Sequence, residues 1–517
     1  TAQPIALPSG ADLTLAASAA NKAVVVKNED DLTVSAVTMG TGVLLKRGVG
    51  KLTIDARSGK CSALANNTGD HKGGDGCNDT GSIVFPEDGT PPTGGFGGFT
   101  VLEGEVVVRG SGATPIAMDG AIHVGMNSPA ARTYPVLTLD GVKVAQSKSI
   151  YDSTLVGYQS GNNAVARHPI LRLVGGTEFS TRSIILDGAY SAVERYPVVA
   201  VTNATIIAVS ESGSVASLAF SSIRQGAGYG AILAAQGTFK CDVMSVNGRT
   251  RSRLTGCTLQ GYSGDYMKLS GDRNAAGEVL FDGGTVLKVN DLGFTDYMEQ
   301  YGSLLTFAFD DATWDIGSGS LTINDANMDQ RKPKEFEVRG QGLTLQVAAG
   351  QMLRTAAKFG GAGCLALTGG GTLKFDAGAF AVTGTVAAVN GTVDLTDAGT
   401  VSNLVVKGAG TISGAAFDKG IVVDPQIGDD WSVGAVPMFV GCTFADRVTV
   451  ECGHGEGTAL ALPSPEVVVA RYTGTAPDVS RWRVRGTGGT GVRGAFTAAN
   501  GEIKMTASAV GLILIVR

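Results

Sequence analysis

The sequence predicts an all-β protein, folded as a right-handed parallel β-helix (β-solenoid) of roughly 20 rungs. Two families of repeats and the near absence of helical periodicity carry this prediction. Each rung of such a fold is one turn of the chain, made of short strands that stack on the strands of the next rung. No single rung can bury its own apolar face, so repetition over hundreds of residues itself favours a solenoid.

The first repeat is the phrase Gly-x-Gly-x-Leu-x-Ile and its variants. It occupies residues 48–54, 317–323, 361–367 and 369–375, with a shorter form at 408–412. Apolar residues alternate after the glycines, and a period of two is typical of a half-buried strand. Each copy therefore predicts a tight turn followed by a short strand.

The second repeat fills the stretch between these phrases. Its pattern is an arginine, then a proline, then two apolar residues, and its prolines are Pro135, Pro169 and Pro197. Proline as the first residue of a strand removes no hydrogen bond from the sheet. The spacing between these prolines predicts rungs of about 20 to 30 residues that start alike.

We expect one domain over residues 1–517. Residues 1–55 would form the N-terminal rungs or cap, 99–470 the main solenoid, and 471–517 the C-terminal rungs and cap. Residues 56–98 are rich in Gly, Asn, Asp and Pro and lack periodicity, which predicts a loop insertion.

Composition narrows the classes of partner. The chain has 517 residues, 75 of them glycine, and a net charge of −6. Its arginines and lysines form no basic stripe, so we expect no nucleic-acid partner. No apolar run approaches the roughly 20 residues that cross a bilayer, so we expect no membrane span. Thr1 follows no leader, which favours a mature N-terminus left by signal removal and a secreted, extracellular or cell-surface location.

The seven cysteines suggest a partial disulfide framework. Three pairs bracket short segments: Cys61–Cys77, Cys241–Cys257 and Cys442–Cys452. Local disulfides of this kind would fit an oxidising compartment. Cys364 then remains as a buried free thiol, and seven reduced cysteines in a cytosolic protein are the alternative.

With these repeats, the chain resembles the parallel β-helical, autotransporter-like surface and adhesin proteins of bacteria. The resemblance is to their β-strand repeats with glycine turns, seen at 44–54, 359–375 and 404–412. The tail, with Trp482 and a final apolar strand at 512–516, is similar to the closing segment of large secreted repeat proteins. The resemblance covers about half of the chain, and the translocator barrel of true autotransporters is not in this sequence.

One series near the C-terminus resembles the catalytic residues of β-helical polygalacturonases. Asp429 and Asp430 precede a Gly-His-Gly element with His454, and Arg483 follows where that family has lysine. Asp418 is the nearest match to the family's remaining aspartate. The resemblance implies an acid and a base flanking a glycosidic bond, which inverting hydrolysis uses at about 6.5–9.5 Å separation. The alternative is that Asp429 and Asp430 form a turn and His454 belongs to a surface loop.

A second cluster combines aromatic rings with carboxylates. Its members are Tyr297, Asp310, Asp311 and Trp314. Such groups suit sugar binding or a Ca²⁺-assisted lyase. The alternative places Phe307 and Phe309 in the core and makes the two aspartates a turn.

A third candidate is the loop that holds Asp70, Asp75 and Asp79. Acidic side chains among glycines can wrap Ca²⁺, although their spacing differs from the helix-loop-helix calcium site. The alternative is a solvated loop pinned by a disulfide.

These observations favour a secreted, non-catalytic surface or matrix protein with a structural or adhesive role. Its partners would be polysaccharide or cell-surface components, and its open ends could build a homo-oligomer or filament. The alternative is a polysaccharide-degrading enzyme, either a polysaccharide lyase or a polygalacturonase-like glycoside hydrolase. We expect no cofactor for the first function, whereas Ca²⁺ would fit a lyase.

Overall fold

The fold is that of a computed structural model. It describes residues 12–16, 23–59, 61, 63–66, 99–113, 115–118, 122–125, 134–146, 154–157, 168–181, 183–186, 196–209, 217–219, 229–246, 248–271, 276–294, 305–323, 335–454, 460, 462–486 and 492–509.

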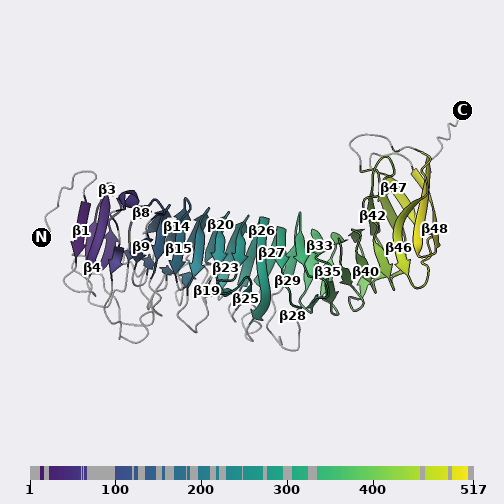
Figure 1. Cartoon of the computed structure of the whole chain (residues 1–517), viewed down its shortest axis with the longest axis horizontal. Helices are drawn as coiled ribbons and strands as arrows, with labels where there is room; N and C mark the ends of the chain where they lie inside the picture. Colours follow the sequence, from purple (N-terminus) through teal and green to yellow (C-terminus); the bar gives the residue numbers. More distant parts are fainter. Residues whose placement is uncertain are drawn as a thin grey trace. The chain divides into compact units, whose positions relative to one another are not determined.

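Within these residues the chain is all β, as predicted, apart from one short 3₁₀ helix, η1 (Ala56–Ser58). The chain divides into two compact units, residues 1–305 and 306–517, and each unit is a stack of parallel strands (Figure 1). Among the described residues, no helix has the length and apolar character needed to cross a membrane. The predicted parallel β-helix is confirmed.

Three parallel ladders build the first unit, and all three end in β26 (Ala276–Phe294). The first ladder contains β3 (Leu32–Val34), β5 (Lys51–Asp55), β8 (Glu105–Arg109), β11 (Val136–Asp140), β14 (Ile170–Val174), β17 (Val198–Thr202), β20 (Ala231–Ala235) and β23 (Arg249–Thr255). The second contains β6 (Ala63–Asn66), β9 (Pro115–Met118), β12 (Lys143–Ala145), β15 (Glu178–Thr181), β18 (Thr205–Ala208), β21 (Thr238–Lys240) and β24 (Thr258–Gln260). The third contains β2 (Ala23–Lys27), β4 (Ala36–Arg47), β7 (Thr100–Val101), β10 (Ile122–Val124), β13 (Thr154–Val156), β16 (Ile184–Leu186), β19 (Ser217–Ala219), β22 (Val243–Val246) and β25 (Met267–Gly271), and β1 (Asp12–Ala16) also pairs with β4.

The second unit repeats this plan with shorter rungs. One ladder contains β27 (Leu305–Asp315), β30 (Leu343–Gln346), β33 (Cys364–Thr368), β36 (Thr385–Ala388), β39 (Val405–Lys407), β42 (Ile421–Ile427), β45 (Val448–Cys452) and β47 (Arg483–Gly486). Another runs from the start of β27 through β29 (Glu335–Val338), β32 (Phe359–Gly361) and β35 (Phe380–Val382), and a short one contains β38 (Thr400–Val401), β41 (Ala416–Phe417) and β44 (Thr443–Phe444). The last contains β28 (Leu321–Ile323), β31 (Met352–Thr355), β34 (Thr372–Phe375), β37 (Thr392–Asp394), β40 (Thr411–Ser413), β43 (Met438–Val440) and β46 (Val467–Thr473). It continues with two antiparallel strands, β49 (Glu502–Ala509) and β48 (Val492–Ala499).

Both sequence repeats form the predicted structures. Every glycine phrase leads into a strand, and its first glycine has a positive φ, at Gly48, Gly317, Gly361, Gly369 and Gly408. This left-handed backbone turns the chain sharply into the strand at no steric cost to glycine.

The repeated prolines stand directly before β11, β14 and β17 of the first ladder. Each proline has no N–H to donate, but its carbonyl still accepts a hydrogen bond from the following rung. The amides of Ile170, Val198 and Ala231 each donate across 3.0 Å to the carbonyl of the proline one rung earlier. The prolines therefore mark the start of one face of the first unit, as predicted.

The predicted insertion at 56–98 starts with regular structure, because η1 and β6 lie inside it. β6 pairs in parallel with β9 and antiparallel with β4. Residues 67–98, including the predicted Ca²⁺ ligands Asp70, Asp75 and Asp79, lie outside the described residues.

One imidazole lies inside the first unit. His123 in β10 is 8% exposed, and burial lowers the pKa of its ring to about 4. Its register partner in β7 is Thr100, which is 1% exposed. In the described part of the chain, neither the His123 Nδ1 nor the Thr100 Oγ1 has a hydrogen-bond partner. Burial therefore favours the neutral ring strongly.

This imidazole should make the first unit sensitive to acid. The folded pKa lies below the unfolded value of about 6.5, so only the unfolded chain gains a proton as the pH falls from 6.5 towards 4. The free energy of unfolding should fall by about 2 kcal/mol at pH 5 for this group alone. His123→Leu should remove that loss, which denaturant titrations of both proteins at pH 7 and pH 5 would measure. An equal pH dependence in the two proteins would contradict the assignment.

Candidate functional site

The predicted catalytic aspartates lie in separate local structures. Asp429 and Asp430 form the turn after β42, as the alternative interpretation expects. The Asp430 carboxylate accepts hydrogen bonds from the Ser432 amide at 3.0 Å and the Ser432 hydroxyl at 2.5 Å, and these bonds lower its pKa. Asp418 follows β41 in a different ladder and accepts from the Ser402 hydroxyl at 3.3 Å.

Arg483 begins β47 and directs its guanidinium to its own turn. Its Nη1 donates to the carbonyl of Ser480 at 3.1 Å and to that of Trp482 at 2.7 Å. These bonds shape the entry to the strand, a structural role that the sequence did not suggest.

His454 contacts a carboxylate that sequence reasoning missed. Its Nε2 lies 2.9 Å from Oδ1 of Asp424, and the Lys407 Nζ lies 2.9 Å from the other oxygen. The Asp424 side chain is 4% exposed, against 37% for His454 and 36% for Lys407. The buried carboxylate thus contacts a half-exposed ammonium group and a half-exposed imidazole at the surface.

A break in the ladder builds this cluster. Lys407 at the end of β39 lies directly opposite Asp424 in β42. Beyond Val423 the pairing of β42 with β45 shifts, so that Asp424, Pro425 and Gln426 face one residue of β45. Bulges of this kind re-aim side chains and are frequent beside active sites.

The backbone keeps the histidine close to this bulge. The amides of Gly453 and His454 both donate to the Ile427 carbonyl, at 2.9 and 3.1 Å. Gln426 and Trp431 adopt left-handed φ angles of 55° and 66°, which non-glycine residues adopt at an energetic cost. Such strain is concentrated at functional sites.

The charges at the cluster support an ionised carboxylate. Burial alone would raise the pKa of Asp424, but hydrogen bonds from Lys407 and the Gln426 amide, with the charges of Lys407 and His454, outweigh it and lower the pKa. A carboxylate that holds one ring nitrogen fixes the orientation of the imidazole, so the other nitrogen can act in proton transfer. On the next strand, Arg485 donates through Nε, at 2.8 Å, and Nη2 to the Glu451 carboxylate.

The structure contradicts the predicted sugar-binding cluster at Trp314, one of its two aromatic members. Trp314 is 2% exposed and packs on Phe336 in the core, so its faces are not offered to a ligand. Inside a strand, alternation shows which residues share a face but not which face is buried. Asp310 accepts a hydrogen bond from the Gln341 amide at 2.8 Å, and Asp311 has a φ of 66°. Tyr297 lies outside the described residues.

The disulfide prediction fails for Cys241 and Cys257, whose thiols are free and buried. β21 and β24 pair in register with Thr238 opposite Thr258, so the two cysteines lie at opposite ends of the pair. They are offset by about four residues, or roughly 13 Å, along the strands. A disulfide needs Cα atoms within about 7 Å.

Cys442 and Cys452 are not bonded to each other either, because they belong to different ladders. The Cys442 thiol lies 3.4 Å from the Ile412 carbonyl, and the Cys452 thiol lies 3.6 Å from the Arg485 carbonyl. Cys61 is a buried thiol that donates to the Val37 carbonyl at 2.9 Å, and burial raises its pKa to about 11. Its predicted partner Cys77 lies outside the described residues.

Cys364 is a free thiol as predicted, although it is half-buried at the start of β33. The described residues hold no group of three His, Cys, Asp or Glu side chains placed to bind a metal ion.

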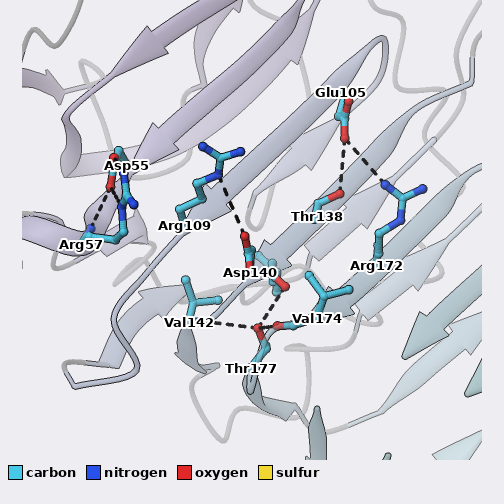
Figure 2. A network of polar contacts seen from close by, with 11 residues as sticks. Asp55, Arg57, Glu105, Arg109, Thr138, Asp140, Val142, Arg172, Val174 and Thr177 are labelled. Carbon is cyan, nitrogen blue, oxygen red and sulfur yellow. Dashed lines mark hydrogen bonds and ion pairs between the residues drawn. The ribbon is translucent and has the colours of Figure 1, made fainter. Parts of the chain in front are cut away.

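The outer face of the first unit shows a different arrangement, in which side chains pair from one rung to the next (Figure 2). Glu105 of β8 lies 3.5 Å from the Thr138 hydroxyl of β11 and 3.8 Å from the Arg172 guanidinium of β14. Arg109 and Asp140 pair at 4.0 Å in the adjacent row. Exposed ion pairs add little stability individually. The main effect of these pairs is therefore to order the charged side chains of this surface and to balance their charges.

A row of rings continues this surface beside the repeated prolines. Tyr134 stacks on His168 at 5.6 Å, His168 on Tyr196 at 5.2 Å, and Tyr196 meets Tyr229 edge-on at 4.8 Å. The guanidinium of Arg251 lies over the Tyr229 ring at 4.4 Å. Since neighbouring rings cover one another, the main effect of the row is to hold successive rungs together.

The fold and these surfaces define a β-solenoid protein. A scan against protein-family models finds no match, and a search of curated proteins finds no relative.

Proposed function

We propose that the protein is a non-catalytic surface or matrix component, secreted by a bacterium, with a structural and adhesive role. Its partners would be polysaccharides or other components of a cell surface. The observation that supports this best is the rung-to-rung pairing on the outer face of the first unit (Figure 2). A surface whose charges and rings satisfy one another over many rungs suits a scaffold that presents fixed contacts to an extended polymer.

Assembly through the solenoid ends belongs to the same proposal. The antiparallel hairpin of β48 and β49 continues one ladder of the second unit, and β48 alternates half-buried and exposed residues. In the described residues β48 pairs on one side only, and such an edge strand can add a strand of another chain. Residues 512–516, the apolar segment predicted as the last strand, lie outside the described residues.

The binding test is affinity electrophoresis of the whole chain through gels that contain acidic or neutral polysaccharides. The adhesive role predicts retardation by at least one polymer. Unchanged mobility in every gel would contradict it.

The second candidate function is a polysaccharide-degrading enzyme, and the contact of His454 with Asp424 favours it. Catalysis there would use the half-exposed imidazole for proton transfer, with Asp424 orienting it. Loss of the carboxylate should then lower turnover by a factor on the order of 10²–10⁴.

The two functions predict different results for Asp424→Asn. A non-catalytic protein should lose about 1–2 kcal/mol of stability, because half-exposed Lys407 and His454 lose their shared partner. It should release no sugar products, either before or after the substitution. Asp430→Asn is the matched control, since that carboxylate binds only its own turn. Product formation that disappears in Asp424→Asn but persists in Asp430→Asn would establish the enzyme instead.

A further inference from the structure

Three arginines project from one face of β23. Arg249, Arg251 and Arg253 are exposed and alternate with the buried residues Thr250 and Ser252. Side chains two residues apart on a strand stand about 6.6 Å from each other on the same face. Three cationic groups therefore follow a line across the outer surface of the first unit, although the whole chain is acidic.

A hollow of about 360 Å³ lies beside this line. It is lined by Arg251, Ser252, Arg253, Gly277, Glu278 and Leu280. The parallel register sets its two walls, since Glu278 of β26 lies opposite Arg251 and Leu280 lies opposite Arg253. The hollow thus combines guanidinium groups, one carboxylate and apolar surface.

Its two arginines are held in place before any ligand arrives. Arg251 lies over the ring of Tyr229, the last member of the aromatic row. Arg253 is anchored by Asp282, whose Oδ2 lies 2.7 Å from Nε and 2.5 Å from Nη2. Asp282 is itself 9% exposed and accepts from the Thr255 hydroxyl at 2.5 Å. Such preorganisation reduces the entropy lost on binding.

The lining matches the chemistry of an acidic sugar. A guanidinium fork binds a carboxylate through two parallel hydrogen bonds. A carboxylate such as Glu278 accepts hydrogen bonds from hydroxyl groups. Leu280 offers apolar surface to the C–H groups of a pyranose ring. A polyanion such as DNA fits less well, because the sugars of its chain have no free hydroxyl groups to donate to Glu278.

We propose that this hollow binds a carboxylated sugar unit of a glycan chain, with Arg251 as the principal contact to the carboxylate. This inference rests on the proposed adhesive function and names its ligand class. The site belongs entirely to the first unit and is separate from the cluster at Asp424.

The test measures binding of the whole chain to polygalacturonate and to the same polymer after full methyl esterification, which removes the charge and keeps the backbone. We expect the esterified polymer to bind at least about tenfold more weakly, and Arg251→Gln to raise the dissociation constant for polygalacturonate by about tenfold or more. Arg251→Lys keeps the charge without the fork and should fall between these values. Arg471→Gln, at an exposed arginine of β46 in the second unit, is the matched control and should bind as the unmodified protein does.

Several outcomes would overturn the assignment. These are equal binding of both polymers, unchanged binding by Arg251→Gln, or full competition by a single-stranded oligonucleotide at equal charge.

Because Arg251 is exposed, circular dichroism of Arg251→Gln should match that of the unmodified chain. If the unmodified protein is retained by polysaccharides but Arg251→Gln is retained equally, only this site is wrong. If no polysaccharide or surface component binds, the adhesive function itself fails.

Discussion

Gly342→Ala is expected to lower the free energy of unfolding of the second unit by about 3–5 kcal/mol, or to prevent its folding. Gly342 precedes β30 with a φ of 100°, and a Cβ there would lie 1.8 Å from the carbonyl oxygen of Cys364 in the next rung. The clash is with backbone, which cannot rotate away. The rungs would have to separate, and the hydrogen bonds between β30 and β33 would lengthen.

Gly350→Ala separates this clash from backbone strain. Gly350 has a φ of 77°, but no atom lies within 4 Å of a Cβ built on it. It should therefore lose only about 1–2 kcal/mol, the cost of a left-handed alanine. Trp314, Trp431 and Trp482 are the chain's three tryptophans and all lie in the second unit, so denaturant titration followed by tryptophan fluorescence reports this unit. Equal losses in the two variants would contradict the close stacking of rungs at Gly342.

Phe336→Ala should have an effect of similar size, about 3–5 kcal/mol, through a cavity in the core. The Phe336 side chain is fully buried, and its ring lies 6.0 Å from Phe307, 5.6 Å from Trp314 and 4.8 Å from Phe359, measured between ring centres. Rings on both neighbouring rungs lose their packing partner at once, because the register places Phe307 and Phe359 on either side of Phe336.

Phe336→Leu is the graded control for this cavity, since it retains most of the volume and should lose less than about 2 kcal/mol. Tryptophan fluorescence again follows unfolding. A loss for Phe336→Ala no larger than for Phe336→Leu would show that the aromatic stack relaxes and fills the space.

The strands were predictable because local pattern and tertiary environment agree. Alternation after each glycine phrase matches the inward and outward faces of β5, β33 and β34. The prolines stand directly before β11, β14 and β17, where a missing N–H is tolerated. These signals lie within a few residues of each other, so they can be recognised in the sequence even when the stacking of the rungs is unknown.

The candidate site was less predictable because stacking decides it. Lys407 and Asp424 are 17 residues apart and meet only because β39 and β42 pair in register. Asp424 follows an apolar run and precedes proline, a signal for a strand break that also marks the bulge. The cysteines show the reverse case: proximity in sequence suggested pairs, but register places Cys241 and Cys257 at opposite ends of neighbouring strands.

The proposed non-catalytic, adhesive role is tested most directly by sedimenting the whole chain with insoluble polysaccharides and assaying the same supernatants for unsaturated and reducing ends. Adhesion without catalysis predicts that protein leaves the supernatant with at least one polymer, while the sugar ends stay at the level of a protein-free control. Sugar ends that accumulate with time in proportion to the protein, and vanish with Asp424→Asn, would contradict it.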